Sequence, residues 1–482
     1  MFDDLREFIK RVDELGECQV IKGADWNLEL SRITELSGTR PDQPLLVFDE
    51  IKGYAPGYRV VTNFFNSYRR FALAHDLSLE ATGVELIKAW RQKMKAGFAP
   101  VPPVVVATGP VTENVHLGAD VDLWEFPTPK WHEIDGGRYI GTGSMVIVKD
   151  PDEGWVNLGT YRVQVHDRTT ANIHIVPGRH GEIIRKKYWS RGQSCPAAVV
   201  CGGEPALWIV STSSAASAGV SEYDYAGWLR GKPVAVLKGK TVDLPIPATA
   251  EIVLEGEMVS PGVDDRLEGP FGEFQGYYTG GSRPESVFKV NCVLHRNNPI
   301  ILGAAPMLMD YDLAWCWDLG RIAGLWNELD RQVPGVTGAW IYTAARTAFT
   351  VVAIKQSYAG HAAETAMAVA GTYAGTFRSR FIVIVDDDID PSNIYQVLWA
   401  LGTRCDPAEH IDITRGFRAI FSDAIVPPEK RRIGDYTTSK AIIYACRPYH
   451  WIKEFPVSFK SSPEVLEETR RKWGKLLFGG HS

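Results

Sequence analysis

Two runs, GTGSMVIVKD at residues 141–150 and WVNLGTYRVQVHD at 155–167, decide the fold class of this chain. Both are short, rich in β-branched and aromatic residues and bounded by turn-forming residues, which is the pattern of β-strands joined by tight turns. The other runs of this kind are ALWIVSTS (206–213), PVAVLKG (233–239), AEIVLEGEMV (250–259), SVFKVNCVLHR (286–296) and PIILGAA (299–305). Seven runs at this density predict a barrel-like or sandwich-like β domain over residues 138–305, interrupted by one helix, GEIIRKKYW (181–189).

Helices dominate on both sides of this β region. Near the N-terminus, apolar residues at helical spacing from Leu5 to Leu15 predict a helix that Gly16 ends. A strand at CQVIKG (18–23) and helices at 27–38 and 84–96 are predicted to follow.

The second half of the chain has a different pattern. DLAWCWDLGRIAGLWNELDRQVPG (312–335) predicts one long helix, because acidic residues lie at its start and Pro334-Gly335 ends it. Strand-like and helix-like runs then alternate from AWIYTA (339–344) to HIDITR (410–415), which is typical of a compact α/β domain. A last helix is predicted in the tail, at PEVLEETRRKWGKLLFG (463–479).

At 482 residues the chain is too long for one ordinary core, so more than one domain is expected. We expect an α+β protein with these parts: a first domain at 1–308, a connecting helix at 309–335, an α/β domain at 336–447 and a helical tail at 448–482.

Composition excludes several classes of protein. A net charge of −6 without a basic cluster gives no support to a nucleic-acid partner. No apolar run reaches the ~18 residues that a membrane helix needs, and the acidic, amphipathic start MFDDLREFIKRVDELG is unlike a secretory signal. The seven cysteines are scattered and form no CxxC, which favours reduced thiols in a cytoplasmic enzyme. The sequence contains no GxGxxG, GxxxxGK[ST], HExxH or GxSxG motif.

The segment RLEGPFGEFQGYY (266–278) offers a candidate acid–base pair. Its glycines and proline predict a turn, which can bring Glu268 and Glu273 to face one site. Paired carboxylates can divide the work, one holding a proton while the other stays charged. A surface loop with two solvated glutamates remains the alternative.

Asn157 and Arg162 lie in one of the strand-like runs. In a regular strand they would point to opposite faces, but Gly159 offers a bulge that would put both into one site. Arg162 would then present a forked guanidinium, suited to a carboxylate. A strand-end arginine in solvent is the alternative.

His180 and Glu222 are further candidates. His180 comes just before a predicted helix, where free backbone N–H groups attract anions, and Glu222 lies beside the small-residue stretch STSSAASAG. Together with Asn157 they would offer O and N donors fit for Mg²⁺ or Mn²⁺. No spacing rule joins the three, and each residue alone is more typical of a cap or a surface.

Two other polar segments are interpreted as structural. VDDDIDP (385–391) lies between a strand and a helix, where Asp390 or Ser392 would cap the helix and the other carboxylates would face water. His361 lies among small residues that indicate tight helix packing.

Several blocks in this order resemble the UbiD family of prenylated-FMN-dependent decarboxylases over nearly the whole chain. The blocks are DVDLWEFPTPKWHEIDGGRYIGTG (120–143), NLGTYRVQ (157–164), GVSEYDYAGWLRG (219–231), PATAEIVLEG (247–256), EGPFGEFQGYY (268–278), KQSYAGHA (355–362), IVDDDIDP (384–391) and TSKAIIYA (438–445).

The resemblance implies a fold and a set of ligands. Residues 1–308 would be a prenylated-FMN-binding catalytic domain with a split β-barrel, and 336–447 an oligomerisation domain of a homodimer or homohexamer. Asn157, His180 and Glu222 match residues that bind Mn²⁺ (or Mg²⁺), and K⁺ is expected nearby. The implied cofactor contacts are Asn157, Thr160, Tyr161, Arg162, Arg179, His180, Ser213, Glu222 and Lys440, and the implied substrate pocket contains His174, Val176 and Phe274.

The resemblance also implies an activity. It is the reversible non-oxidative decarboxylation of an aromatic or heteroaromatic acid through a covalent adduct with the prenylated flavin, which a flavin prenyltransferase would supply. Arg162 would orient the carboxylate, Glu268 would hold Arg162, and Glu273 would protonate the product carbon. The alternatives are a cinnamate-like α,β-unsaturated acid as substrate, a flavin-dependent oxidoreductase, and a non-catalytic subunit.

Overall fold

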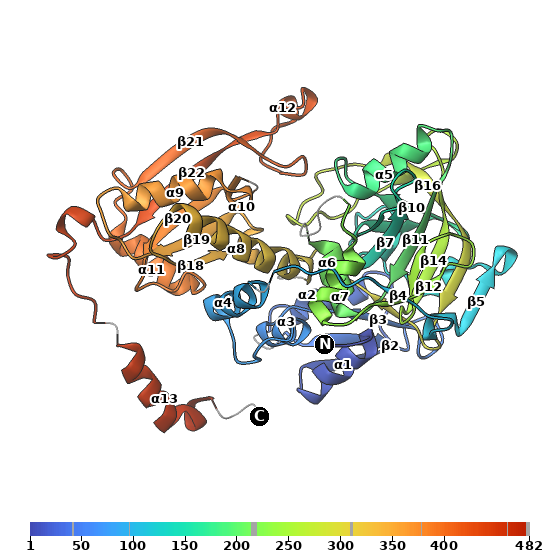
Figure 1. Cartoon of the computed structure of the whole chain (residues 1–482), viewed down its shortest axis with the longest axis horizontal. Coiled ribbons are helices and arrows are strands. Elements are labelled where there is room, and N and C mark those ends of the chain that lie inside the picture. Colours follow the sequence, from blue (N-terminus) through green and yellow to red (C-terminus); the bar gives the residue numbers. More distant parts are fainter. Residues whose placement is uncertain are drawn as a thin grey trace.

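A computed structural model of the chain describes residues 1–40, 43–95, 97–213, 219–308, 312–376, 378–459 and 461–478, except the side chains of 312–318, 463 and 478. Figure 1 shows two lobes, with the long helix α8 (Asp312–Gln332) running between them. The first three residues of the expected connecting helix, 309–311, lie outside the described residues.

The largest sheet of the first lobe contains ten strands. They are β5 (Asn114–Leu117), β6 (Arg138–Gly141), β7 (Ser144–Lys149), β8 (Val156–Gly159), β9 (Arg162–Val165), β10 (Thr170–His174), β11 (Cys195–Cys201), β14 (Ile252–Met258), β15 (Asp265–Glu268) and β16 (Arg283–His295). Eight of them follow the path β6-β9-β10-β16-β14-β11-β7-β8, and β5 and β15 pair with β16 beside this path.

This sheet curls until its two ends lie close together. β6 and β9 form one end of the path and β7 and β8 the other, yet β6 is joined to β7 by Thr142–Gly143 and β8 to β9 by Thr160–Tyr161. Two-residue connections can only join strands that are already neighbours in space, so the expected barrel-like β domain is confirmed as a curled, split barrel. The prediction of one bulged strand through Asn157 and Arg162 is wrong, because the chain crosses between the two ends of the sheet.

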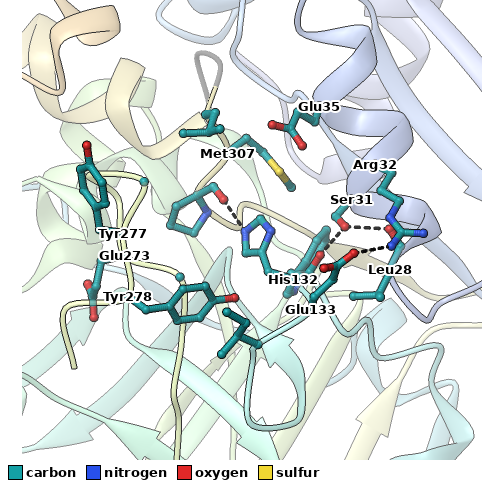
Figure 2. A pocket seen from close by; sticks show the side chains of 16 residues that line it. Leu28, Ser31, Arg32, Glu35, His132, Glu133, Glu273, Tyr277, Tyr278 and Met307 are labelled. Carbon is teal, nitrogen blue, oxygen red and sulfur yellow. Dashed lines mark hydrogen bonds and ion pairs between the residues drawn. The ribbon is translucent and has the colours of Figure 1, made fainter. Parts of the chain in front are cut away.

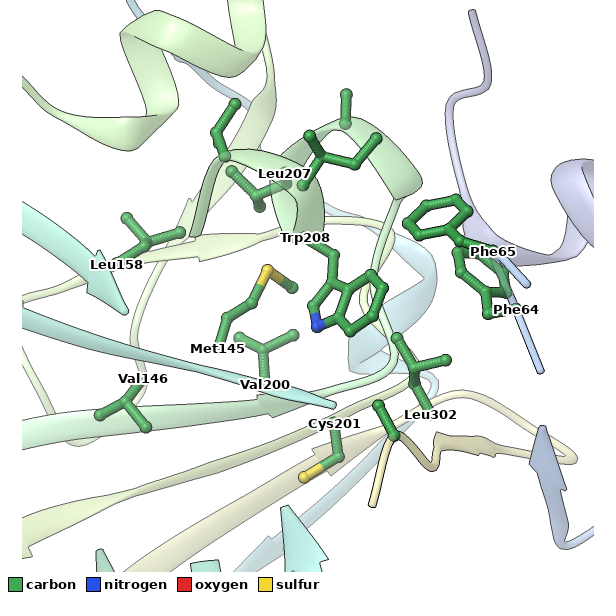
Figure 3. Close-up of a cluster of buried hydrophobic side chains, with 14 of the residues drawn as sticks. Phe64, Phe65, Met145, Val146, Leu158, Val200, Cys201, Leu207, Trp208 and Leu302 are labelled. Atoms are coloured by element: carbon green, nitrogen blue, oxygen red, sulfur yellow. The ribbon is translucent and has the colours of Figure 1, made fainter. Parts of the chain in front are cut away.

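A helix with a fully buried surface packs on this sheet. The run ALWIVSTS was expected to be a strand, but the structure forms α6 (Pro205–Thr212), with Pro205 in its first turn. Trp208 lies against Phe65, with ring centroids 5.3 Å apart, and near Met145 and Val200 of the sheet (Figure 3). Because every side of α6 is buried, its sequence lacks the periodicity that separates a helix from a buried strand.

Two smaller sheets and more helices complete the first lobe. One sheet has the order β1-β2-β3-β17, and the other β13-β12-β4. Their strands are β1 (Cys18–Lys22), β2 (Leu45–Asp49), β3 (Arg59–Thr62), β4 (Val104–Val105), β12 (Ala235–Lys238), β13 (Pro245–Pro247) and β17 (Ile300–Leu302). The other helices are α1 (Leu5–Glu14), α2 (Glu29–Ser37), α3 (Tyr68–Ala74), α4 (Gly83–Met94), α5 (His180–Trp189), α7 (Glu222–Arg230) and the short turns η1 (Pro110–Thr112), η2 (Gly118–Asp120) and η3 (Leu123–Glu125).

The second lobe, orange in Figure 1, is built on a sheet of order β18-β19-β20-β22-β21. Its strands are β18 (Val336–Ile341), β19 (Phe349–Ile354), β20 (Phe381–Asp386), β21 (Ile411–Arg418) and β22 (Thr437–Ala445). Its helices are η4 (Thr343–Ala345), α9 (His361–Gly371), α10 (Tyr373–Thr376), α11 (Ile394–Arg404), α12 (Pro428–Arg432) and η5 (Tyr449–Trp451). The predicted alternation of strands and helices is confirmed.

The two polar segments of this lobe are structural. Asp386 and Asp388 both pair with Arg404, at 2.8 and 2.7 Å. Asp390 accepts hydrogen bonds from Ser392 in the turn before α11, although the cap of that helix is Asn393. His361 is fully buried, with Nε2 2.9 Å from the carbonyl oxygen of Pro334.

The last helix, α13 (Pro463–Phe478), lies apart from both lobes (Figure 1). Large apolar side chains remain exposed along it, namely Val465, Leu466, Trp473, Leu476 and Leu477. Among the helices that the structure describes, none combines the length and the apolar character needed to cross a membrane.

Candidate active site

Arg162 joins the two glutamates that the sequence singled out. Its Nε and one terminal nitrogen donate to the two carboxylate oxygens of Glu268, at 2.7 and 2.9 Å. The other terminal nitrogen donates to Oε1 of Glu273, at 3.0 Å. The expected meeting of these three side chains is therefore observed.

Glu268 is fully buried at the end of β15. Burial alone would raise the pKa of Glu268, but the hydrogen bonds and charge of Arg162 outweigh it, so that the pKa lies below its ordinary value. The hydroxyl of Tyr139 also donates to Glu268, at 3.3 Å. Glu268 is therefore a charged anchor that fixes the guanidinium plane of Arg162.

Gln164 and Asp135 bind the loop that carries Glu273, and the sequence interpretation did not identify either of them. The backbone N–H of Gly269 donates to Oε1 of Gln164 at 2.9 Å. Oδ1 of Asp135 accepts from the N–H of Gly272 at 3.1 Å and from the hydroxyl of Tyr278 at 3.0 Å. Asp135 and Gln164 both lie in the blocks that carry the resemblance, which was the available signal for their role.

Asn157 and Glu222 form a second polar centre. Nδ2 of Asn157 donates to Oε1 of Glu222 at 3.0 Å, and the N–H of Leu158 donates to Oε2 at 2.8 Å. Burial raises the pKa of Glu222 to about 7. Oδ1 of Asn157 is buried without a hydrogen-bond partner. A buried carboxylate beside an unsatisfied amide oxygen is a donor set that fits a hard divalent cation.

His180 reaches this region from the first turn of α5, which packs on β8 as α7 does. Partial burial and the charge of Arg179 lower the pKa of His180, which favours the neutral imidazole that metal binding requires. Its ring lies 5.0 Å from that of Trp155. Arg179 itself is the exposed N-cap of α5.

Thr160 and Tyr161, which link β8 at one end of the sheet to β9 at the other, lie between Arg162 and the Asn157–Glu222 pair. Thr160 binds the end of α6, with its N–H 3.2 Å from the carbonyl of Ser211, while Ser213 follows as the C-cap of that helix. The hydroxyl of Tyr161 accepts from the N–H of Gly181 at 3.3 Å. Gly159 does not form the expected bulge. It leaves room for the ring of Tyr161, whose hydroxyl oxygen would lie 2.4 Å from a Cβ at this position.

His174 faces Arg162 across the β9–β10 pair and is already engaged. Its Nε2 accepts from Arg283 at 2.9 Å, so Nδ1 carries the proton that faces Glu285, at 3.0 Å. Burial and the charges of Arg162 and Arg283 lower the pKa of His174 despite Glu285. A neutral histidine with both nitrogens occupied positions its neighbours and has no free polar atom for a substrate.

The other expected pocket residues lie at the edges of this region. Val176 follows β10 and is partly exposed, and Phe274 is buried beside Glu273. The guanidinium of Arg378, from the second lobe, lies over the ring of Phe274 at 4.0 Å.

Lys440 is not brought to this site. It lies in β22 of the second lobe, where its ammonium group donates to the carbonyl of Gly375 at 2.8 Å and also to that of Ser379. These bonds hold the side chain of Lys440 within its own lobe, and the cofactor contact expected from the resemblance stays a prediction.

A cavity of about 320 Å³ opens beside Glu273 (Figure 2). Trp131, His132, Tyr277 and Met307 are among the residues that line it, and Glu273 is the member of the Arg162 cluster that reaches it. His132 is held by the carbonyl of Pro306, at 2.7 Å. Glu273 thus contacts Arg162 and also lines this cavity.

The fold and site define a class of protein, and family models agree. Models described as the N-terminal, Rift-related and C-terminal domains of 3-octaprenyl-4-hydroxybenzoate carboxy-lyase match residues 9–90, 104–308 and 314–445. The chain belongs to the UbiD family and is an enzyme of the carboxy-lyase class.

Individual relatives support the same class. Pyrrole-2-carboxylic acid decarboxylase of Pseudomonas aeruginosa is 32% identical over 84% of this chain and 83% of its own length. The UbiD-class enzyme HmfF of Pelotomaculum thermopropionicum, solved with FMN, is 26% identical with a TM-score of 0.84, covering 96% of this chain and 98% of that one. The expected α+β, UbiD-like fold is confirmed.

A third relative has been solved in two forms. Vanillic acid decarboxylase of Sedimentibacter hydroxybenzoicus is 28% identical and covers 99% of both chains. Its open form matches this structure with a TM-score of 0.85 and its closed form with 0.77. This structure is therefore more similar to the open form of that enzyme than to its closed form.

Proposed function

We propose that this carboxy-lyase catalyses the reversible non-oxidative decarboxylation of an aromatic or heteroaromatic acid with prenylated FMN. The observation that carries the proposal is Arg162, fixed by the buried Glu268 and ending 3.0 Å from Glu273 beside a cavity. An oriented cation next to a carboxylic acid suits a substrate carboxylate that leaves as CO₂ and a carbon that is then protonated.

Asn157, His180 and Glu222 would hold Mn²⁺ or Mg²⁺ and, through it, the phosphate of the cofactor, with K⁺ nearby. The unsatisfied Oδ1 of Asn157 and the buried Glu222 support this assignment. Thr160, Tyr161, Arg179 and Ser213 lie around the same crossing and would complete the cofactor contacts. When bound, the prenylated flavin, made by a flavin prenyltransferase, supplies the group that accepts the electron pair left behind by CO₂.

Proton delivery follows from competition for Arg162. In this structure a terminal nitrogen of Arg162 donates to Glu273. A substrate carboxylate that takes this nitrogen releases the Glu273 side chain from Arg162 and holds the reacting carbon beside it. After CO₂ leaves, Glu273 donates a proton to the product carbon and takes one up again from water, so charge and protons balance.

The relatives support an aromatic or heteroaromatic substrate over a cinnamate-like acid. They include a pyrrole-2-carboxylic acid decarboxylase and phenolic acid decarboxylases. An oxidoreductase would leave the Arg162 cluster without a role. We further infer a homo-oligomer, since a solved relative is described as an evolved dimeric form.

The test is co-expression with a flavin prenyltransferase, followed by measurement of CO₂ and product across a panel of aromatic and unsaturated acids. Glu273→Gln is expected to lower turnover by ~100-fold or more while the flavin absorbance is retained. Glu133→Gln is the matched control, because Glu133 lines the same cavity but pairs with Arg32 at 2.8 Å. Absence of CO₂ from every acid, with prenylated flavin verified in the protein, would contradict the proposal, and consumption of an electron acceptor would favour an oxidoreductase.

A further inference from the structure

Two histidines and a glutamate gather at the outer edge of the first lobe, in a place that the proposed reaction does not use. His116 lies in β5, His295 at the end of β16, and Glu125 in η3. β5 and β16 are paired, with His116 opposite Val293 and Asn114 opposite His295. One nitrogen of each histidine and a carboxylate oxygen of Glu125 all lie within 4.8 Å of one another.

The distances in this cluster match those between the ligands of a small tetrahedral metal ion. Nδ1 of His116 lies 3.2 Å from Oε2 of Glu125, and Nε2 of His295 lies 3.6 Å from Oε1. Metal–ligand bonds of about 2.0–2.1 Å at tetrahedral angles separate neighbouring donor atoms by about 3.4 Å. The distances of 3.2 and 3.6 Å are close to this separation, and the two imidazole nitrogens lie within 4.8 Å of each other.

The hydrogen bonds of His295 assign a free lone pair to Nε2. Its Nδ1 lies 2.9 Å from the carbonyl oxygen of Arg296, which can only accept, so Nδ1 carries the proton. Nε2 is buried, lacks a hydrogen-bond partner and faces the carboxylate of Glu125. Two acceptors that face each other lack a positive group between them, and a backbone bond at Nδ1 is the usual support of a metal-binding histidine.

Neighbouring side chains hold the three residues in place. The hydroxyl of Tyr58 donates to Oε1 of Glu125 at 2.8 Å. The ring of Phe126 meets His295 edge-on, with ring centroids 5.4 Å apart, and the rings of His116 and His295 stand perpendicular at 5.2 Å. The side chains of His116 and Glu125 are 29% and 25% exposed, which leaves a path for an ion and a position for a water ligand.

We propose that His116, Glu125 and His295 form a metal site for a borderline divalent ion of the Zn²⁺ class, with water as the fourth ligand. Two imidazoles and one carboxylate are donors that suit Zn²⁺ or Co²⁺, in contrast to the oxygen-rich Asn157–Glu222 centre. The ion ties η3 to the β5–β16 pair. Because the folded chain presents the three ligands together, binding stabilises the folded state.

Cobalt titration tests this site without reference to the flavin or to turnover. Full-length protein is stripped of metal with a chelator and titrated with Co²⁺, whose four-coordinate complexes with imidazole absorb visible light far more strongly than six-coordinate complexes with oxygen ligands. The wild type is expected to bind one equivalent with this spectrum, and Zn²⁺ is expected to displace it. His116→Gln and Glu125→Gln are expected to weaken binding about 100-fold, while the exposed His450→Gln leaves it unchanged.

Thermal unfolding gives a second measurement. Zn²⁺ is expected to raise the unfolding temperature of the wild type and of His450→Gln, but not that of His116→Gln, whose partly exposed side chain can be replaced without opening the core. Equal Co²⁺ affinity in the wild type and in both folded ligand variants would overturn the proposal. A wild type without the four-coordinate spectrum would overturn it as well.

Discussion

At the scale of single residues, Arg162 connects two carboxylates with different tasks. Glu268 takes two of its nitrogens and is completely buried, whereas Glu273 takes one and borders a cavity. One guanidinium thus contacts a buried anchor on one side and, on the other, the carboxyl group that we propose as the proton donor.

The anchor predicts a pH-dependent contribution to stability. Because the pKa of Glu268 is lowered in the folded state, its ion pair with Arg162 stabilises the fold fully above the ordinary pKa of 4.5, and this contribution is lost as the pH falls through the lower folded value. Glu268→Gln is expected to lower the free energy of unfolding by about 3 kcal/mol near neutral pH.

Urea unfolding of both proteins near neutral pH and again well below pH 4.5 measures this difference, which is expected to shrink in acid. Glu133→Gln, on an exposed ion pair, is expected to unfold like the wild type at both pH values. A difference between Glu268→Gln and the wild type that is constant with pH would contradict the assignment.

The candidate residues could be named from the sequence, but not all of their contacts could. The turn at 268–273 predicted that two carboxylates could meet, and they do, through Arg162. His174 could not be assigned, because its partners Arg283 and Glu285 lie on β16, more than a hundred positions away in the chain. Lys440 shows a different limit. The resemblance implies that it contacts the cofactor, but a resemblance between sequences does not specify where the second lobe, which holds Lys440, lies relative to the first.

At the scale of elements, the turn between β8 and β9 is the part that holds the site together. Gly159 and Gly181 both lie against the ring of Tyr161, and the backbone N–H of Thr160 donates to the end of α6. This turn therefore fixes the start of α5 and the end of α6 relative to the sheet.

Gly159→Ala is expected to disrupt this turn. The new Cβ would lie 2.4 Å from the hydroxyl oxygen of Tyr161, so the ring must move, and we expect a loss of about 1–3 kcal/mol in the free energy of unfolding together with weaker flavin retention. Thermal unfolding and flavin content measure both effects.

Gly402→Ala is the matched control for this prediction. Gly402 lies in α11 with open space around it, and alanine there is expected to be neutral or to stabilise by about 0.5–1 kcal/mol. Equal behaviour of the two variants would show that Tyr161 does not need the space at Gly159.

Elements with one buried face and one exposed face could be predicted from the sequence, whereas an element buried on all sides could not. α1 shows a regular apolar stripe of Leu5, Phe8 and Val12, and its bounds follow from the sequence. α6 is buried on all sides and was mistaken for a strand. The break at Thr160 was also missed, because sequence pattern gives the direction of a side chain but not the partner of a strand.

At the scale of the whole molecule, the second lobe touches the loop that carries Glu273. Arg378 lies over Phe274, and Arg431 donates to the carbonyl of Thr279 at 3.2 Å. A change in the position of the second lobe would therefore move this loop.

The tail predicts the state of association. The apolar residues of α13 are exposed, with Leu476 79% accessible, and the helix lies apart from its own lobes, so we expect it to pack on another copy of the chain. Deletion of residues 457–482 is expected to lower the molar mass measured by light scattering after gel filtration.

Substitutions within the helix refine this test. Leu476→Ser combined with Leu477→Ser should act like the deletion, whereas Glu467→Ser should not. An unchanged molar mass after the deletion would show that association, if any, does not use α13.

The curled sheet also has a consequence for how the enzyme comes into being. Asn157 and Arg162 leave the ribosome within moments of each other, yet β8 and β9 belong to opposite ends of a path whose central strand, β16, is synthesised more than a hundred residues later. Pairings of such long range are slow, and the edges of β10 and β14 stay open until β16 arrives. The nascent chain therefore exposes unpaired strand edges until residues 283–295 have been synthesised.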